Sequence, residues 1–488
     1  MQTADASVIE TGNGNSSAFR LLQKLPASVV YFGLFFLLFL FTQLVRFNGL
    51  YGQDSYAYVR IAGEWRTFLL GGALPGFSHW PPIYPLLGGL LGILLPVHLS
   101  LQLISIGAHV FAGFLLEKIL PKLYPESRKM ARSYALLFLI FSPFLLRTAL
   151  CDMSDSLSMF FVILAWYVAI SMREQYRATR LYLFAFAAAA GIMTRYGVFV
   201  LIVPAIFLVI KPVLRNKSLS QLFLAMLFAS AVCLPLLLLR SPASLDFLKK
   251  SWLEEWSPMN FLLTTFSNSN GHYSYTVQNI IYAVFAYFHP GFLFLGAGVL
   301  FFRKSIEYRN RQVLVILIAL GCYSLFLAGI PFQNMRFFVP AMPLFLLVFF
   351  PVFQQGYAAI RFNTTWVLIG ILLLQAGLFT RAFLPFYRYN AEERAITQAC
   401  ITTATGPLYE FSMEGALTFY GFKNRQVSLW DEKLQSVDKN TFLLFNLPLL
   451  EKEFAGRNPM INFEFIRANA RLEPIQQLPG GWTLYAIR

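Results

Sequence analysis

Charged residues are scarce in this sequence of 488 residues, of which only 13% are charged. In soluble proteins this fraction is usually near ~25%. Hydrophobic residues make up 57% of the chain and aromatic residues 17%, and runs of about 20 apolar residues, long enough to cross a bilayer, recur along it. The composition therefore excludes a soluble enzyme, a disordered chain and a collagen-like chain, and it indicates an integral membrane protein.

Cysteines are few as well, and Cys151, Cys233, Cys322 and Cys400 lie far apart in the sequence. Their spacing matches neither a disulfide framework nor a cysteine-based metal motif. The sequence also lacks an internal repeat, which is a feature of transporters built from two related halves. These absences argue against a disulfide-stabilised scaffold and weaken a transporter function.

Acidic residues are outnumbered by basic ones, 24 Asp and Glu against 39 Lys and Arg, which gives a net charge of +15. The excess lies in residues 1–384, with 28 basic and 13 acidic side chains, whereas residues 385–488 hold 11 of each. It falls in short loops between apolar runs, where positive charge orients membrane helices, and not on a soluble face of the kind that binds nucleic acid. We therefore expect a lipid bilayer, and no nucleic acid, as a partner.

The apolar runs predict an all-α polytopic membrane bundle in the cell membrane. Because basic loops stay on the cytoplasmic side, the tail 1–26, which has a disordered composition, is expected inside and the C-terminus outside. The segment 81–96, interrupted by prolines, is expected to lie at the outer surface or to dip into it. Residues 27–384 then form a domain of about eleven spans, at 27–45, 100–117, 133–150, 154–172, 181–194, 197–210, 219–239, 277–301, 312–330, 337–354 and 364–384.

Three long segments are expected on the extracytoplasmic side: 46–99 with interfacial helices, 240–276, and the tail 385–488. In the loop 240–276, Trp252, Trp256 and His272 are candidates for closing over a substrate. The tail alternates strand-like and helical runs, which predicts a small α/β domain. Its strand-like runs are 408–412, 426–430, 442–447, 463–467 and 482–487.

Acidic side chains near membrane depth are costly and indicate function. Asp54 follows the first expected span, and Asp152 and Asp155 lie at the turn between two later ones. Each has a simpler explanation: Asp54 as a solvated loop acid, Asp155 as the N-cap of the following helix, and Asp152 as a partner of Arg147. Asp54 and Asp155 are our candidate catalytic residues, and Asp152 is a candidate substrate-binding residue.

Basic residues lie at the corresponding ends of other expected spans. Arg195 falls in a turn between two short helices and Arg336 precedes a late span, and guanidinium groups bind phosphate oxygens in a fork. Both arginines could instead be interface anchors that snorkel. His79, beside a rigid Pro-Pro turn, and Tyr58, in an amphipathic segment after Asp54, complete the candidate substrate-binding set. Carboxylates beside guanidinium groups at one membrane depth would form a cavity for an anion.

Five motifs follow one another in a recognisable order: GQDSYAY (52–58), HWPPIYPLL (79–87), RTALCDMSDSLSMFF (147–161), MTRYGVF (193–199) and QNMRFFVPAMP (333–343). In this order, over about residues 28–350, they resemble the GT-C superfamily of membrane glycosyltransferases. The most similar members are those of the protein mannosyltransferase and lipid A aminoarabinose transferase group, in its bacterial branch. The tail looks like the variable external domain of that family.

This resemblance implies an enzyme that transfers a sugar from a polyprenyl phosphate to a lipid, glycan or protein acceptor on the outer face, in cell-envelope glycoconjugate synthesis. Asp54 then matches the catalytic acid of the first loop, Asp155 the second acidic position, Arg195 the basic turn position, and Arg336 the late basic position near the lipid phosphate. Many relatives carry two adjacent acids in the first loop, but Asp54 stands alone in residues 50–56. A metal ion held by paired carboxylates is therefore not expected there, although a divalent ion shared with Asp155 stays open as the one candidate cofactor.

Two other functions fit parts of the pattern. A transporter or lipid flippase would line its route with the same charges, but near the centres of the spans, whereas these charges lie at span ends. A non-catalytic subunit of a surface-polysaccharide assembly machine would use the external tail to bind a partner. Sugar transfer by the purified protein alone separates the enzyme from both alternatives.

Overall fold

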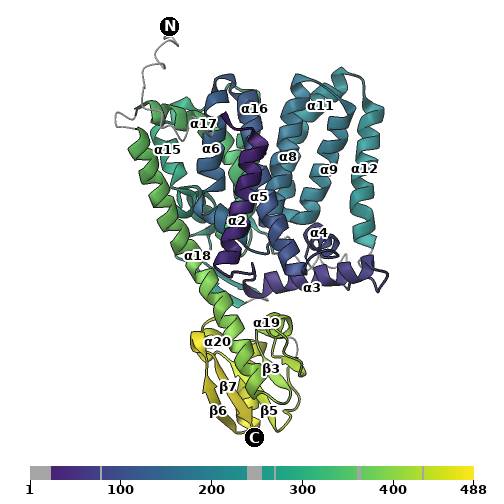
Figure 1. Ribbon diagram of the computed structural model, residues 1–488, viewed down its shortest axis with the longest axis vertical. Coiled ribbons are helices and arrows are strands. Elements are labelled where there is room, and N and C mark those ends of the chain that lie inside the picture. Colours follow the sequence, from purple (N-terminus) through teal and green to yellow (C-terminus); the bar gives the residue numbers. More distant parts are fainter. Residues whose placement is uncertain (1–23, 77–79, 239–254, 269–270, 360–363, 431–432) are drawn as a thin grey trace.

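The structure is a computed structural model that describes residues 24–76, 80–238, 255–268, 271–359, 364–430 and 433–488. It consists of a helical bundle with a C-terminal domain attached to one end (Figure 1). We call the end of the bundle that faces this domain the domain-side end.

Long apolar helices build the bundle, as the composition predicts. Their bounds are α2 (Ala27–Leu44), α5 (Val97–Leu123), α8 (Asp155–Glu174), α9 (Ala178–Thr194), α12 (Leu219–Leu238), α16 (Arg311–Ala328), α17 (Met342–Ala359) and α18 (Thr364–Thr403). Shorter elements complete it, namely α6 (Ala131–Ala135), the π-helix η3 (Leu136–Ile140), α7 (Pro143–Leu150), α10 (Phe199–Ile202), α11 (Ile206–Arg215), α14 (Asn279–Phe285), α15 (Leu295–Phe301) and the 3-10 helix η11 (Met335–Ala341).

The multi-span membrane bundle is confirmed, but with fewer full-length spans than the eleven expected. Within the described residues, seven helices are long and apolar enough to cross a membrane, or eight if the bent pair of α6–η3 and α7 counts as one. The apolar segments Ala178–Thr194, Leu219–Cys233 and Asn279–Phe288 are shorter. The expected span 277–301 is broken at Pro290 by short 3-10 turns, because proline cannot continue a regular helix.

The chain bends by 68° between η3 and α7, inside the expected span 133–150. A π-helical turn such as η3 disturbs the regular ladder of backbone hydrogen bonds. Two of its carbonyl groups find partners on neighbouring helices: His109 Nε2 lies 3.1 Å from the oxygen of Ile140, and Gln375 donates to the oxygen of Leu137 at 2.7 Å. Polar side chains of α5 and α18 therefore stabilise the bend inside the bundle.

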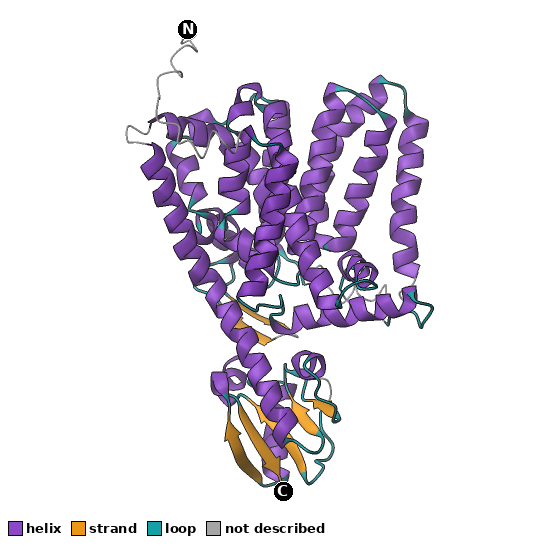
Figure 2. Cartoon of the chain, viewed as in Figure 1, coloured by secondary structure: helices purple, strands orange, loops and turns teal. Residues whose placement is uncertain are grey.

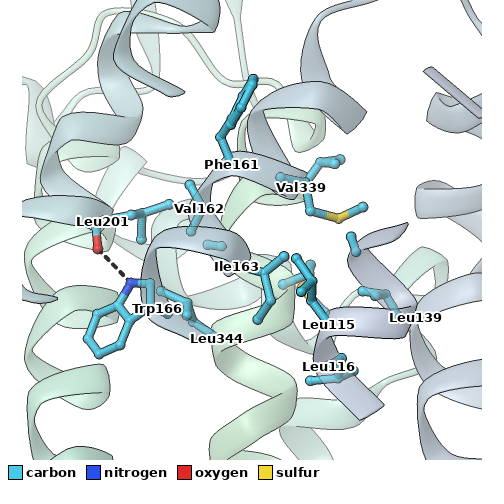
Figure 3. Close-up of a cluster of buried hydrophobic side chains, with 14 of the residues drawn as sticks. Leu115, Leu116, Leu139, Phe161, Val162, Ile163, Trp166, Leu201, Val339 and Leu344 are labelled. Carbon is cyan, nitrogen blue, oxygen red and sulfur yellow. Dashed lines mark hydrogen bonds between the residues drawn. The ribbon is translucent and has the colours of Figure 1, made fainter. Parts of the chain in front are cut away.

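The core of the bundle surrounds α8, which packs against α5 and α9. Trp166 is fully buried there, and its Nε1 donates a hydrogen bond of 3.0 Å to the carbonyl oxygen of Leu201 (Figure 3). Figure 3 also shows packed side chains from several helices, among them Leu115, Leu116, Leu139, Phe161, Val162, Ile163, Val339 and Leu344. This packing fixes α8 and η11, both of which begin at the candidate site described below.

Two helices lie at the domain-side end of the bundle, α3 (Gly52–Leu69) and α4 (Ile83–Leu91). α3 runs across this end, nearly perpendicular to the long helices (Figure 1). Gly89 of α4 approaches α3 so closely that an added Cβ atom would lie 2.7 Å from both the oxygen of Ala62 and the Cβ of Trp65. The two helices therefore pack tightly against each other at the domain-side end.

α18 is 40 residues long and continues past residue 384, where the expected span ends. At ~1.5 Å per residue its length is ~60 Å, about twice the hydrocarbon thickness of a bilayer. It leaves the bundle and enters the C-terminal domain (Figure 1). The expected domain boundary at residue 385 therefore falls inside a continuous helix.

The C-terminal domain contains a mixed sheet, drawn in orange in Figure 2. It has five strands in the order β4-β3-β5-β7-β6. Strands β4, β3 and β5 are parallel, and β7 is antiparallel to both β5 and β6. Its elements are β3 (Leu408–Glu410), α19 (Glu414–Phe419), β4 (Gln426–Ser428), β5 (Thr441–Phe445), α20 (Leu447–Phe454), α21 (Asn458–Asn469), β6 (Leu472–Gln477) and β7 (Thr483–Ile487). The expected small α/β domain is confirmed.

The prediction of a strand at 463–467 is wrong, because these residues belong to α21. Phe463 and Ile466 are both buried, and their spacing of three residues is that of a helix face. β6 is a strand that the sequence pattern does not predict, since five of its six residues are exposed and it shows no alternation of apolar residues.

A hairpin of β1 (Thr265–Asn268) and β2 (Gly271–Ser274) lies within the expected loop 240–276. β2 packs against α20, and Arg457 donates through Nη2 to Ser267 Oγ at 2.8 Å. The ring of Tyr273 meets that of Phe332 at a centroid distance of 5.4 Å. The hairpin therefore connects the C-terminal domain to the segment before η11.

Candidate active site

Asp54 lies in the first turn of α3, which the chain enters through two glycines. Gly49 (φ +83°) and Gly52 (φ +63°) adopt the left-handed conformation, which other residues rarely adopt. Gly49 also packs so closely against Asp152 that no Cβ atom would fit. The side chain of Asp54 is 33% exposed, so it is accessible to solvent without being a free loop acid.

Asp155 is fully buried at the start of α8. Its carboxylate does not cap its own helix, because both oxygens face arginine side chains. One of these is Arg195, whose extended backbone ends α9 and whose Nη1 forms an ion pair with Oδ1 of Asp155. The guanidinium of Arg195 also lies 5.1 Å from the ring centre of Phe337. Arg195 therefore points into the protein and is not a snorkelling anchor.

Arg336 connects the two carboxylates. Its Nη1 donates to Oδ2 of Asp54 at 2.9 Å, and its Nε lies 2.8 Å from Oδ2 of Asp155. Asn334 begins η11 and accepts a hydrogen bond of 3.0 Å from the backbone N–H of Arg336. The structure thus brings together Asp54, Asp155, Arg195 and Arg336, which we call the four-charge cluster.

The four-charge cluster joins α3, α8, the end of α9 and η11, segments that are far apart in the sequence. Its two carboxylates and two guanidinium groups cancel in formal charge, which offsets the cost of removing them from water. The exposed fraction is 33% for Asp54, 16% for each arginine and zero for Asp155. A reactant therefore reaches the cluster from the side of Asp54, where it meets a proton acceptor beside groups that stabilise an anion.

Tyr58 is only 2% exposed, although it was expected to contact a substrate. Its Oη lies 2.9 Å from Oγ of Ser154, the residue directly before Asp155, and burial raises the pKa of Tyr58 to about 12. The hydroxyl group therefore stays protonated at neutral pH and connects α3 to the start of α8. This contact aligns Asp54 with Asp155, a different role from the expected one.

Asp152, a candidate substrate-binding residue, lies outside the four-charge cluster, and among the described residues it does not pair with Arg147, which was the simpler explanation for it. It is fully buried, and neither carboxylate oxygen has a hydrogen-bond partner among the described residues. Burial raises the pKa of Asp152 well above its usual range. The packing of the side chain next to Gly49 therefore favours its protonated form.

Asp152→Asn is expected to stabilise the protein at neutral pH. Because the folded-state pKa lies above the unfolded value of about 3.9, the wild type loses stability as the pH rises above that value, whereas an amide does not titrate. Thermal unfolding in detergent from about pH 4 to about pH 8 should give a Tm difference in favour of the variant that grows with pH. A Tm difference that shrinks toward high pH would contradict a raised pKa of Asp152.

Arg147 has surroundings that the sequence does not predict. Its guanidinium lies between the rings of Phe144 and Phe386, at 4.4 and 4.2 Å from their centres. Within the described residues, its buried Nε has no hydrogen-bond partner, and no carboxylate forms an ion pair with it. The charges of Arg336 and Asp155 are close enough to act on it. Arg147 therefore adds an unbalanced positive charge next to a cluster that is neutral.

Of the other candidates, those that the structure describes take no part in the cluster. His79 and Trp252 lie outside the described residues, Trp256 is fixed by a 2.9 Å hydrogen bond from Nε1 to the oxygen of Phe326, and His272 is exposed on β2. In the part of the chain that the structure describes, no group of three or more His, Cys, Asp and Glu side chains is arranged to hold a metal ion. Because arginines occupy both carboxylates of the cluster, its residues do not fit a metal ion.

Neither a protein-family model nor a curated protein matches this chain. Its fold is similar to that of ArnT from Cupriavidus metallidurans in a crystal structure with bound undecaprenyl phosphate, with a TM-score of 0.60 and 13% identity over 94% of this chain and 97% of that one. For the apo structure of ArnT the TM-score is 0.57 and the identity 14%, over 94% and 98% of the two chains. The expected fold of a multi-span membrane bundle with a C-terminal domain is confirmed, and it is similar to that of ArnT over 94% of this chain.

Proposed function

We propose that this chain is a membrane glycosyltransferase that moves a sugar from a polyprenyl-phosphate donor to an acceptor hydroxyl group. The observation that supports this most is the four-charge cluster, in which an accessible carboxylate lies beside two guanidinium groups at one end of a membrane bundle. The fold shared with ArnT, which was crystallised with undecaprenyl phosphate, supports a polyprenyl phosphate as the carrier. In this proposal the domain-side end faces outward, the N-terminus is cytoplasmic, and the product is a cell-envelope glycoconjugate.

Asp54 is the general base in the proposed reaction. The acceptor oxygen attacks the anomeric carbon and forms the new glycosidic bond, while the bond from that carbon to the phosphate oxygen breaks. The electron pair of the broken bond leaves with the polyprenyl phosphate, and the hydroxyl proton passes to the carboxylate of Asp54. General-base assistance of this kind typically contributes ~100- to ~10,000-fold. Direct displacement inverts the configuration at the anomeric carbon.

Arg336 and Arg195 stabilise the charge that grows on the departing phosphate, but Asp54 and Asp155 already balance their charges. A phosphate therefore needs a further cation, and Arg147 supplies it. This side chain stacks on Phe386 of α18, a helix with many exposed apolar residues such as Leu373. The lipid donor thus reaches Arg147 from the bilayer along α18.

Arg147→Gln is expected to weaken binding of a polyprenyl phosphate by about 10- to 100-fold, the effect of losing one hydrogen bond to a charged group. Binding of the uncharged polyprenol should not change, because the apolar contacts stay. Titration of the purified protein in nanodiscs with both lipids measures the difference, and Arg66→Gln, an exposed arginine of α3, is the matched control. Equal losses for the phosphate and the alcohol would remove Arg147 from the phosphate site.

The proposed function is tested by comparing glycolipids and glycoproteins of cells with and without the gene by mass spectrometry. The missing mass identifies the sugar, and its carrier identifies the acceptor. The polyprenyl-phosphate sugar that accumulates in the deletion strain is then given to the purified protein with that acceptor. Transfer by this protein alone supports the enzyme, whereas unchanged glycoconjugates, or transfer that needs a second protein, would refute it.

A further inference from the structure

One face of α18 holds the segment 47–56, which contains Asp54. The residues of this face are spaced by three or four positions and therefore point the same way. Each contacts that segment: Phe383 packs on Phe47 (5.0 Å between ring centres) and Phe386 on Tyr51 (3.7 Å), Asn390 donates to the oxygen of Leu50 (3.0 Å), and Glu393 accepts from Tyr56 Oη (2.9 Å). The helix that enters the C-terminal domain thus supports the loop with the proposed base.

Glu393 is the charged member of this face and is only 2% exposed. Besides the hydroxyl group of Tyr56, the backbone amide of Gly52 also interacts with its carboxylate. Gly52 is the first residue of α3, and the first amides of a helix have no partner within the helix. A negative charge at this position is favourable. Glu393 therefore places a carboxylate from another helix at the start of α3, where Gly52 lies two residues before Asp54.

The C-terminal domain holds the same turn from a second direction. Gln53 donates to Ser412 Oγ at 2.8 Å, and an added Cβ atom on Gly415 would lie 2.5 Å from the Cβ of Tyr56. On the opposite side, the carboxylate of Asp54 meets the guanidinium of Arg336. The first turn of α3 is therefore held between the C-terminal domain and the four-charge cluster.

We infer that Glu393 is a positioning residue, which fixes the first turn of α3 and so places Asp54 against Arg336. The C-terminal domain then completes the active site and does more than cover it. The catalytic consequence of this inference rests on the proposed function, because a misplacement of about 1 Å costs an enzyme about 100-fold in rate. The structural consequence, an ordered first turn of α3, does not depend on catalysis.

Glu393→Ala is expected to lower kcat by about 10- to 100-fold while KM for the donor stays within about twofold, because Glu393 does not touch the lipid site. Glu393→Gln should recover most of the rate, since its amide oxygen still accepts from Tyr56. Glu392→Ala is the matched control, an acid one position earlier that is turned away from Tyr56 and only partly buried. Equal kcat values for the two alanine variants, or a loss that Gln does not reverse, would overturn the inference.

Hydrogen–deuterium exchange provides a measurement that does not require activity. The amides of residues 51–57 should exchange at least about tenfold faster in Glu393→Ala than in Glu392→Ala, because the first turn of α3 opens more often once its contact with Glu393 is lost. Tyr56→Phe, which removes one hydroxyl group, carries the same test if Glu393→Ala does not fold. Unchanged exchange would overturn the positioning role. If exchange is faster in Glu393→Ala but the wild type transfers no sugar, the proposed function is rejected and the positioning role of Glu393 stands.

Discussion

Asp54→Asn should lower the rate of sugar transfer by at least ~100-fold and leave the amount of folded protein unchanged. Asparagine has the shape of aspartate, and its amide oxygen can still accept the hydrogen bond from Arg336, but it cannot take a proton from the acceptor. Because Asp54 is 33% exposed, the loss of its charge costs little folding free energy. Label transferred per minute from the polyprenyl-phosphate sugar to the acceptor by the purified variant measures the effect.

Glu64→Gln is the control for this substitution. Glu64 lies on the same helix and forms an exposed ion pair with Arg60, so its replacement also removes one carboxylate from α3, at a distance from the cluster. We expect the wild-type rate for this variant. Wild-type transfer by Asp54→Asn would remove Asp54 from the mechanism.

Arg336→Ala is expected to have the largest effect, a loss of about 1,000-fold in kcat/KM together with a weaker affinity for the donor. Removal of one preorganised group that stabilises developing charge typically costs ~100- to ~1,000-fold. This variant also leaves Asp54 without a partner and the fully buried Asp155 with Arg195 alone. Breaking a buried ion pair costs about 3–5 kcal/mol, so the Tm of the variant should fall as well.

Arg336→Lys separates the geometry of the bridge from its charge. The guanidinium contacts Asp54 through Nη1 and Asp155 through Nε, whereas an ammonium group is a single point of charge and does not reproduce the planar fork. We therefore expect lysine to restore stability in part and activity hardly at all. Thermal unfolding and the rate of sugar transfer of the purified variants test this, and a donor titration measures their affinity for the donor. Unchanged donor affinity in Arg336→Ala would remove Arg336 from the phosphate site and leave it only the structural role of joining Asp54 to Asp155.

Much of the fold could be predicted from the sequence, because hydropathy reports directly on bilayer crossing. The α2 span and the break of the chain at Arg195 lie where the pattern places them. The misses have local causes. Proline breaks the expected span 277–301. The segment around Phe463 and Ile466 has the local sequence pattern of a strand, but in the structure these two residues form the buried face of α21. The end of α18 could not be predicted, because its packing partners belong to the C-terminal domain.

The sequence could predict those residues of the candidate site that lie at the same depth in the bundle. Asp54, Asp155, Arg195 and Arg336 all lie at span ends, so a topology from hydropathy places them at one end of the molecule, where the structure brings them into contact. The depth of a residue in the bundle does not determine which side chains it contacts. Arg147 lies between two aromatic rings, and only the tertiary structure shows this.

The most direct test of the proposed chemistry is to measure free polyprenyl phosphate and transferred sugar together, with the purified wild type and Asp54→Asn. We predict one molecule of polyprenyl phosphate released for each sugar transferred by the wild type, and almost none of either product with the variant. Donor that crosses the membrane with its sugar–phosphate bond intact, or equal release by the two proteins, would contradict a transferase centred on Asp54.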